Sequence, residues 1–202
     1  MITSVIFDVG NVLYGWDPSS FLVNQIADDE ERLRFIEDAD FFGWHEGLDG
    51  GRPFDEAAAE LSEKFPAYAA LIRAWGDRFG ETITDPVEGV HAIVEELDAR
   101  GIALFGITNF SADFWRPFVE RERAFFRRFR DVVVSGEVGL LKPDPAIYYL
   151  ALHRFCLQPA EALFVDDRRI NVEAAEAVGM PGHLFTDAAE LRQRLLTEGL
   201  LQ

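Results

Sequence analysis

The sequence has little cysteine and no long hydrophobic run. Its one cysteine, Cys156, cannot form an internal disulfide, and no Cys/His spacing typical of a zinc site occurs, so neither bond type holds the fold. A reducing compartment fits this composition. No apolar run approaches the roughly 18 residues of a membrane-spanning helix, and no basic segment precedes the first apolar run. We therefore expect a cytoplasmic protein with no membrane partner.

Basic residues are also scarce. The chain has 36 acidic and 19 basic residues in 202, which gives a formal net charge of −17. Such a field repels phosphate backbones and anionic membrane surfaces, so nucleic acid is not an expected partner. Only Lys64 and Lys142 are lysines, which makes the setting of each informative. A chain of this length buries roughly 70% of its unfolded surface, enough for one core and a small accessory domain.

Short apolar runs alternate with amphipathic segments along the chain. Helix-like stretches lie among the runs, and this alternation predicts an α/β fold with a Rossmann-like parallel sheet covered by helices. The runs read as strands at residues 4–7, 102–107, 132–134 and 162–165, with a weaker fifth at 182–185, and the helices fall at 86–100, 144–155 and 170–178.

The first two predicted strands are separated by roughly 80 residues that contain helix-like segments but no convincing strand. A crossover between parallel strands needs only about a dozen residues, so we expect an inserted helical subdomain. The predicted core covers residues 1–14 and 86–202, and the predicted helical cap covers 15–85. The cap helices are expected at 21–26, 30–38, 54–65 and 68–79.

Polar side chains follow several of the predicted strands. The first strand ends in D-V-G-N at residues 8–11, the second in Thr108-Asn109 and the fourth in Asp166-Asp167, while Lys142 lies in a loop before a helix. In an open α/β sheet, ligands bind at the carboxyl ends of the strands. We therefore expect three carboxylates, a hydroxyl, an amide and an ammonium to meet at one edge.

Three neighbouring carboxylates repel one another and raise each other's pKa unless a cation neutralises them. A hard divalent ion does this, and Mg²⁺ favours carboxylate and carbonyl oxygen and is usually completed by water and a substrate phosphate. Such a site binds phosphate despite the overall negative charge, because the ion and Lys142 set the local potential.

Four segments together match a known family. They are V-I-F-D-V-G-N-V-L, G-I-T-N-F-S, G-L-L-K-P-D-P-A-I-Y and A-L-F-V-D-D-R-R-I-N-V-E-A-A-E-A-V-G-M. In this order, spread from residue 3 to residue 180, they resemble the haloacid dehalogenase-like hydrolase superfamily, and the predicted insertion falls where that family places its cap. The D-x-G-N variant resembles a branch that contains sugar-phosphate (glucose-1-phosphate-type) phosphatases.

The resemblance implies a role for each matched residue. Asp8 would be the nucleophile that forms an aspartyl-phosphate, and it would also bind Mg²⁺. Thr108 and the backbone amide of Asn109 would hold phosphoryl oxygens. Lys142 would balance charge between Asp8 and the phosphoryl group. The pair Asp166-Asp167 would anchor Mg²⁺, with support from the nearby Asn171.

Gly10 departs from the family pattern. Most phosphatases of this family carry a second Asp there, and a residue two positions after Asp8 in a strand faces the same side. The Gly10 carbonyl can still bind the metal, but the general acid is lost, typically at a cost of about 10² to 10⁴ in rate. A substitute acid could come from His45, Glu46 or Asp17, and His45 and Glu46 are also expected to contact substrate.

These observations predict a Mg²⁺-dependent hydrolase that removes phosphate from a small phosphorylated metabolite, for which a sugar phosphate is one candidate. Two alternatives remain. The first is a catalytically silent protein that binds a phosphate or a partner, and Gly10 is its evidence. The second is a metal-free 2-haloacid dehalogenase, which also lacks the second Asp, although the Asp166-Asp167 pair argues against it. The sequence does not determine the substrate or the oligomeric state.

Overall fold

A computed structural model describes all residues from 1 to 202, and its centre is a five-stranded parallel sheet with the order β5-β4-β1-β6-β7. The sequence predicts all five strands and their parallel arrangement, and the structure confirms this α/β fold. The strands are β1 (Ser4–Phe7), β4 (Ala103–Thr108), β5 (Asp131–Val134), β6 (Ala162–Asp166) and β7 (Gly182–Leu184).

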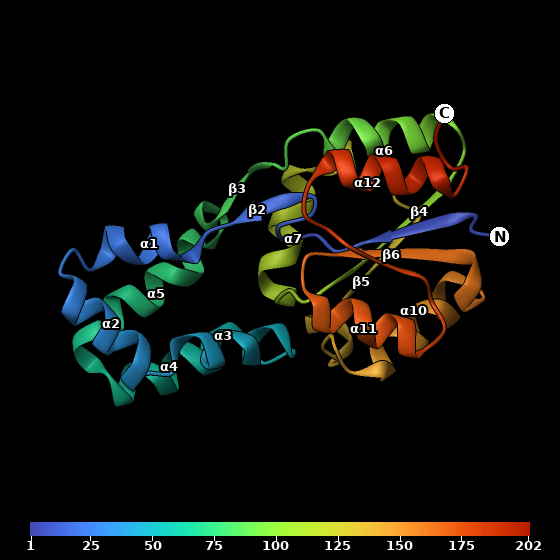
Figure 1. The fold of residues 1–202 in the computed structure, drawn as a ribbon. Coiled ribbons are helices and arrows are strands. Elements are labelled where there is room, and N and C mark those ends of the chain that lie inside the picture. Colours follow the sequence, from blue (N-terminus) through green and yellow to red (C-terminus); the bar gives the residue numbers. More distant parts are fainter.

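Helices cover both faces of the sheet because the strands are apolar on both sides. In β1, Val5 and Phe7 belong to one buried cluster and Ile6 belongs to another, as the alternation of side chains in a strand requires. Figure 1 shows one pair of helices above the sheet and a second pair below it. The pairs are α6 (Val90–Ala99) with α12 (Ala188–Thr197), and α10 (Pro145–Phe155) with α11 (Arg169–Ala177).

Between β1 and β4 the chain forms a lobe beside the sheet, on the left in Figure 1. We call residues 17–82 the helical insert. It contains α1 (Pro18–Gln25), α2 (Asp29–Asp38), α3 (Phe41–Asp49), α4 (Phe54–Lys64) and α5 (Ala69–Arg78). The sequence predicts four of these helices but not α3, in which Gly43 and Gly47 lower the helix propensity.

The expectation that this stretch contains no strand is wrong. The insert is joined to the core by an antiparallel ribbon of β2 (Tyr14–Trp16) and β3 (Ile83–Pro86). The two strands have only three and four residues, too few for an apolar alternation to be visible in the sequence. Both chain passages between sheet and insert therefore run side by side.

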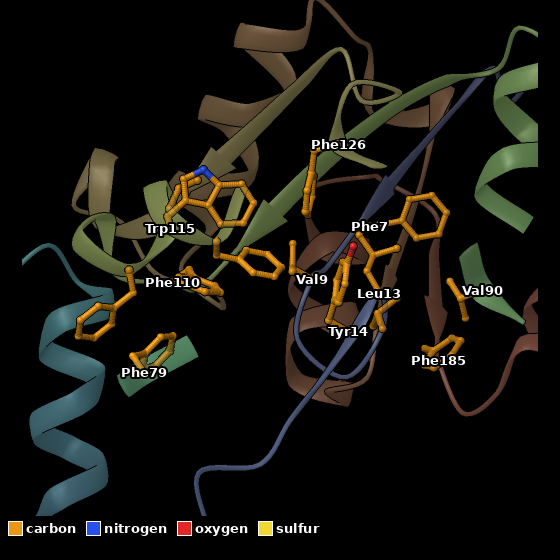
Figure 2. Close-up of a cluster of buried hydrophobic side chains, with 14 of the residues drawn as sticks. Phe7, Val9, Leu13, Tyr14, Phe79, Val90, Phe110, Trp115, Phe126 and Phe185 are labelled. Atoms are coloured by element: carbon orange, nitrogen blue, oxygen red, sulfur yellow. The ribbon is translucent and has the colours of Figure 1, made fainter. Parts of the chain in front are cut away.

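Aromatic side chains fill the space where the insert meets the core, between the sheet and α7 (Ala112–Arg121) and α8 (Arg123–Phe126) (Figure 2). Phe79 lies at the end of the insert, and its ring centroid is 5.6 Å from that of Phe110 and 4.2 Å from that of Phe114. Stacked and edge-to-face aromatic pairs of this kind stabilise a contact beyond the area that they bury. The remaining helix, α9 (Ser135–Val138), follows β5. No helix of this fold has the length and apolar character that crossing a membrane requires.

Candidate active site

Three carboxylates meet where the central strands end. Asp8 follows β1, and its backbone N–H donates to the Val165 carbonyl at 2.8 Å, so the hydrogen bonding between β1 and β6 continues to this point. Asp166 ends β6 and Asp167 follows it. One oxygen from each of Asp8, Asp166 and Asp167 lies within 4.8 Å of the others. The parallel pairing of β1 and β6 therefore brings the carboxylates together at one edge.

Lys142 bridges two of these carboxylates. Its Nζ lies 2.8 Å from Asp8 Oδ1 and 2.7 Å from Asp166 Oδ2, and the residue is only 2% exposed. The loop that carries Lys142 is held by Asn109, which follows β4. The Asn109 side-chain amide donates to the Lys142 carbonyl at 2.9 Å and accepts from the Lys142 N–H at 2.8 Å. The scarce lysine is thus a buried and fixed cation.

Asp166 and Asp167 have different surroundings. Asp166 is fully buried and accepts hydrogen bonds from Asn171 Nδ2 at 3.0 and 3.1 Å and from the Arg168 N–H at 2.8 Å. Asp167 lines a cavity and accepts one bond, of 3.3 Å, from Asn11 Nδ2. Asp166 therefore holds Lys142 from the buried side of the cluster, while Asp167 faces the cavity.

The charges of the cluster do not cancel one another. Burial raises the pKa of the Asp8 carboxyl, the positive charge of Lys142 opposes this, and the negative charge of Asp166 adds to it. Burial and the Asp166 charge also raise the pKa of Asp167. Burial works against the charged form of Lys142, but the attraction of Asp8 and Asp166 prevails and raises its pKa. When all four groups are ionised, three negative charges face one positive charge.

This donor set fits a hard divalent cation. The excess of two negative charges matches the charge of Mg²⁺, and carboxylate oxygens are its preferred protein ligands. Asp8, Gly10 and Asp167 all line the same cavity. No sulfur or imidazole ligand belongs to the cluster, so the site is not of a zinc type.

The cluster opens into a cavity of about 630 Å³ between the sheet edge and the helical insert. Among the residues to which the sequence analysis gives a role, those at the cavity surface are Asp8, Gly10, His45, Glu46, Asn109, Lys142, Asp167 and Asn171. Thr108 and Asp166 are buried beneath that surface. Asp17 is not part of the cavity wall, because it caps α1 by accepting from the Ser20 N–H at 3.1 Å.

The insert contributes His45 and Glu46 from α3, together with Asp49, which no sequence pattern indicated. His45 is 4% exposed and stacks between the rings of Trp16 and Phe79, at 5.6 Å from each. Burial lowers its pKa to about 4, so His45 is neutral at pH 7. Glu46 is exposed. No sequence signal distinguishes Asp49 from the other acidic residues of so acidic a chain.

A parallel α/β core that presents a carboxylate, a buried lysine and an acidic pair at its strand ends, beneath a helical insert, defines a class of hydrolase. The model of the haloacid dehalogenase-like hydrolase family matches residues 5–183. The chain belongs to this family, as the four sequence segments predict.

Its relatives include phosphatases. The chain is 28% identical to the sesquiterpene phosphatase astK of Aspergillus oryzae, over 94% of this chain and 95% of that protein. It is 24% identical to the N-acetylmuramic acid 6-phosphate phosphatase of Pseudomonas aeruginosa, over 88% of this chain and 79% of that protein.

The fold resembles that of a haloacid dehalogenase family enzyme from Bacteroides thetaiotaomicron solved with magnesium and inorganic phosphate. The TM-score is 0.71 at 20% identity, over 95% of this chain and 99% of the other. A dehalogenase structure is also similar, with a TM-score of 0.62 at 16% identity, over 90% and 83% of the two chains.

Proposed function

We propose that this protein is a Mg²⁺-dependent phosphatase that hydrolyses a small phosphomonoester through an aspartyl-phosphate on Asp8. The observation that carries the proposal is the position of Asp8, which is held 2.8 Å from a buried lysine and lies beside Asp167 in a cavity. The phosphatases among the relatives support this reaction class. Bound Mg²⁺ would be held by Asp8, Asp167 and the Gly10 carbonyl, with Asp166 behind them, and would supply charge stabilisation for the phosphoryl oxygens.

Each remaining step of the proposed reaction is carried by residues of the chain. An Asp8 carboxylate oxygen attacks phosphorus, and the bond from phosphorus to the leaving oxygen breaks. Lys142 favours the ionised form of Asp8 against the effect of burial and offers its positive charge to the phosphoryl oxygens. The Thr108 hydroxyl and the Asn109 N–H hold those oxygens in place. Water then attacks phosphorus and returns Asp8 to its free carboxylate.

The cavity wall bears on the kind of substrate. Trp16, Phe42 and Phe79 line it beside the acidic groups of the insert. Aromatic faces accept the apolar face of a sugar ring or another apolar leaving group. A sugar 1-phosphate leaves from an anomeric carbon, which eases departure in a site that has no side chain at position 10. Sugar phosphates are therefore our first candidates, and apolar organic phosphates are the second.

The test is phosphate release from a panel of sugar 1-phosphates, sugar 6-phosphates, apolar alkyl phosphates and 4-nitrophenyl phosphate. It is run with Mg²⁺ and again with a chelator. We expect release that needs Mg²⁺ and that Asp8→Asn abolishes. Full activity in Asp8→Asn would exclude Asp8 as the nucleophile.

A second candidate function is binding without turnover, which the bare Gly10 favours. Magnesium and phosphate binding by calorimetry, together with silence on every substrate, would establish it. Release of halide from a 2-haloacid in the presence of chelator would instead identify a dehalogenase.

A further inference from the structure

Position 10 has no side chain and has room for one. A Cβ added to Gly10 would meet no atom within 4 Å, and Gly10 lines the same cavity as Asp8. No group attached there can exchange a proton with a leaving oxygen or with water. A proton donor for this site must therefore come from another element that faces the cavity.

Asp49 is the last residue of α3 and lines this cavity together with Asp8 and Gly10. Two groups of the core lie against it. The backbone N–H of Ser111, which directly precedes α7, lies close enough to the Asp49 carboxyl to lower its pKa. The Asp49 backbone carbonyl accepts from Ser135 Oγ at 2.6 Å, at the start of α9. Although Asp49 belongs to the insert, its position is fixed by the ends of β4 and β5.

Glycines make this close approach possible. Gly51 follows α3 with a φ of 100°, and a Cβ there would lie 3.1 Å from the Gly136 carbonyl oxygen. A Cβ on Gly136 would lie 2.4 Å from the Ala112 nitrogen. A side chain at Gly51 would push the end of α3 away from Gly136, and one at Gly136 would displace the backbone just before α7, which lies beside the end of α3. The contact that holds Asp49 is thus built into the local sequence.

The surroundings of Asp49 favour its protonated form. Burial raises its pKa to about 7, the Ser111 N–H opposes this, and the charges of Glu46 and Asp8 add to it. His45, with Nε2 at 3.8 Å from Asp49 Oδ1, is neutral because burial lowers its pKa. No cation is among the groups that influence Asp49. A carboxyl that titrates near neutral pH can both donate and accept a proton.

The other acidic groups of the insert are less suited. Glu46 is exposed, and Asp17 is engaged in capping α1. His45 lies within an aromatic box and has no proton to give at pH 7 beyond that of a neutral imidazole.

We propose that Asp49 is the general acid and base of this site and takes over the proton transfers that position 10 cannot make. This inference rests on the phosphatase function proposed above. In the first step Asp8 attacks phosphorus, the ester bond breaks, and the leaving oxygen takes the Asp49 proton and departs as an alcohol. In the second step Asp49 takes a proton from water while the water oxygen attacks phosphorus. The bond from phosphorus to Asp8 breaks, its electron pair returns to Asp8, and phosphate leaves with Asp49 protonated again.

The test compares two leaving groups in Asp49→Asn. An alkyl phosphate needs protonation of its leaving oxygen, so its kcat should fall by about 10² to 10⁴. With 4-nitrophenyl phosphate, whose leaving group departs without a proton, the first step should survive. Rapid mixing should then show a burst of one nitrophenolate per enzyme. Slow turnover should follow, because hydrolysis of the aspartyl-phosphate is the step that lacks its base. For the alkyl phosphate, the wild-type kcat should fall at higher pH as Asp49 loses its proton. This fall should be absent from Asp49→Asn.

Two further variants make the test specific. Asp77→Asn removes an exposed carboxylate of the insert that is outside the cavity wall, and it should keep the wild-type kcat. Adding Gly10→Asp to Asp49→Asn places a carboxyl in the open space beside Asp8. The double variant should have a kcat at least tenfold higher than Asp49→Asn alone. Circular dichroism should match the wild type in every variant, and Mg²⁺ affinity should match it in Asp49→Asn and Asp77→Asn.

The outcomes separate the two proposals. If the wild type releases phosphate from neither substrate, the phosphatase function fails and this inference fails with it. If the wild type is active and Asp49→Asn keeps its alkyl-phosphate kcat within about threefold, only the role of Asp49 is overturned. Equal loss on both substrates, with no burst and no rescue by Gly10→Asp, also overturns it and leaves Asp49 as a residue that only holds α3 to the core.

Discussion

The side chain of Asn109 and the backbone of Lys142 exchange two hydrogen bonds, of 2.9 Å and 2.8 Å. This pair joins the end of β4 to the loop before α10 and fixes where Lys142 enters the carboxylate cluster. Asn109 therefore has a structural task besides the contact with phosphate that we propose for its backbone N–H.

Asn109→Ala should leave the Lys142 N–H and carbonyl without their partners. We expect a loss of about 1 to 3 kcal/mol in the free energy of unfolding, the usual cost of unsatisfied buried polar groups. A displacement of Lys142 by about 1 Å should lower kcat about 100-fold. Urea unfolding and steady-state kinetics measure the two effects. Unchanged kcat would show that the loop holds its position without Asn109.

Magnesium should stabilise the folded protein, because only the folded state brings Asp8 next to the adjacent carboxylates of Asp166 and Asp167. At a Mg²⁺ concentration 100 times the Kd, the gain is about 2.7 kcal/mol and appears as a higher Tm. Asp167→Asn removes one cavity-facing ligand and should weaken Mg²⁺ binding by more than the roughly 10- to 100-fold typical of residues behind the ligands. A wild-type Tm that does not respond to Mg²⁺ would contradict the assignment of the cluster as a metal site.

His45 should make stability depend on pH. Burial lowers its pKa from 6.5 to about 4, so between these values the unfolded state binds more protons than the folded state. Stability contributed by neutral His45 is therefore present above pH 6.5 and is lost on acidification toward pH 4, by about 3 kcal/mol in total. His45→Phe keeps an aromatic ring in the box but removes the titration. The difference between the two proteins in urea unfolding from pH 7 to pH 4 measures this contribution, and parallel curves would refute it.

Replacing two of the glycines by alanine should change the free energy of unfolding in opposite directions. Gly136→Ala places a Cβ 2.4 Å from the Ala112 nitrogen and 2.7 Å from the Phe110 carbonyl oxygen, both of which are backbone atoms. We expect a loss of about 1 to 3 kcal/mol or more, because the backbone must shift. Gly47→Ala, inside α3 with no atom within 4 Å of the new Cβ, should instead stabilise by about 0.5 to 1 kcal/mol. Chemical denaturation of both variants checks the pair, and equal effects would contradict it.

Much of the core could be predicted from the sequence because its signals are local. Each strand of the parallel sheet is a short apolar run. The start of α10 is indicated by Asp144 as N-cap and Pro145 in the first turn. The ribbon of β2 and β3 gives no such signal, because its two strands are short and are paired across the whole insert. A contact between segments so far apart in the chain leaves no periodic pattern in either of them.

The candidate site divides in the same way. Asp8, Asp166 and Asp167 could be brought together from the sequence, since each directly follows or ends a strand of one sheet and parallel strands end at one edge. The burial of His45 and the presence of Asp49 at the cavity could not. Both depend on how α3 packs against the core through Ser111 and Ser135.

The order of strands and helices, the family and the residues at the strand ends can all be inferred from the sequence, because they follow from local patterns and from the geometry of a parallel sheet. Which groups of the insert face the cavity, and which protonation state they favour, depends on the folded arrangement. Those properties arise from burial and from charges on other elements, which no single segment of the chain records.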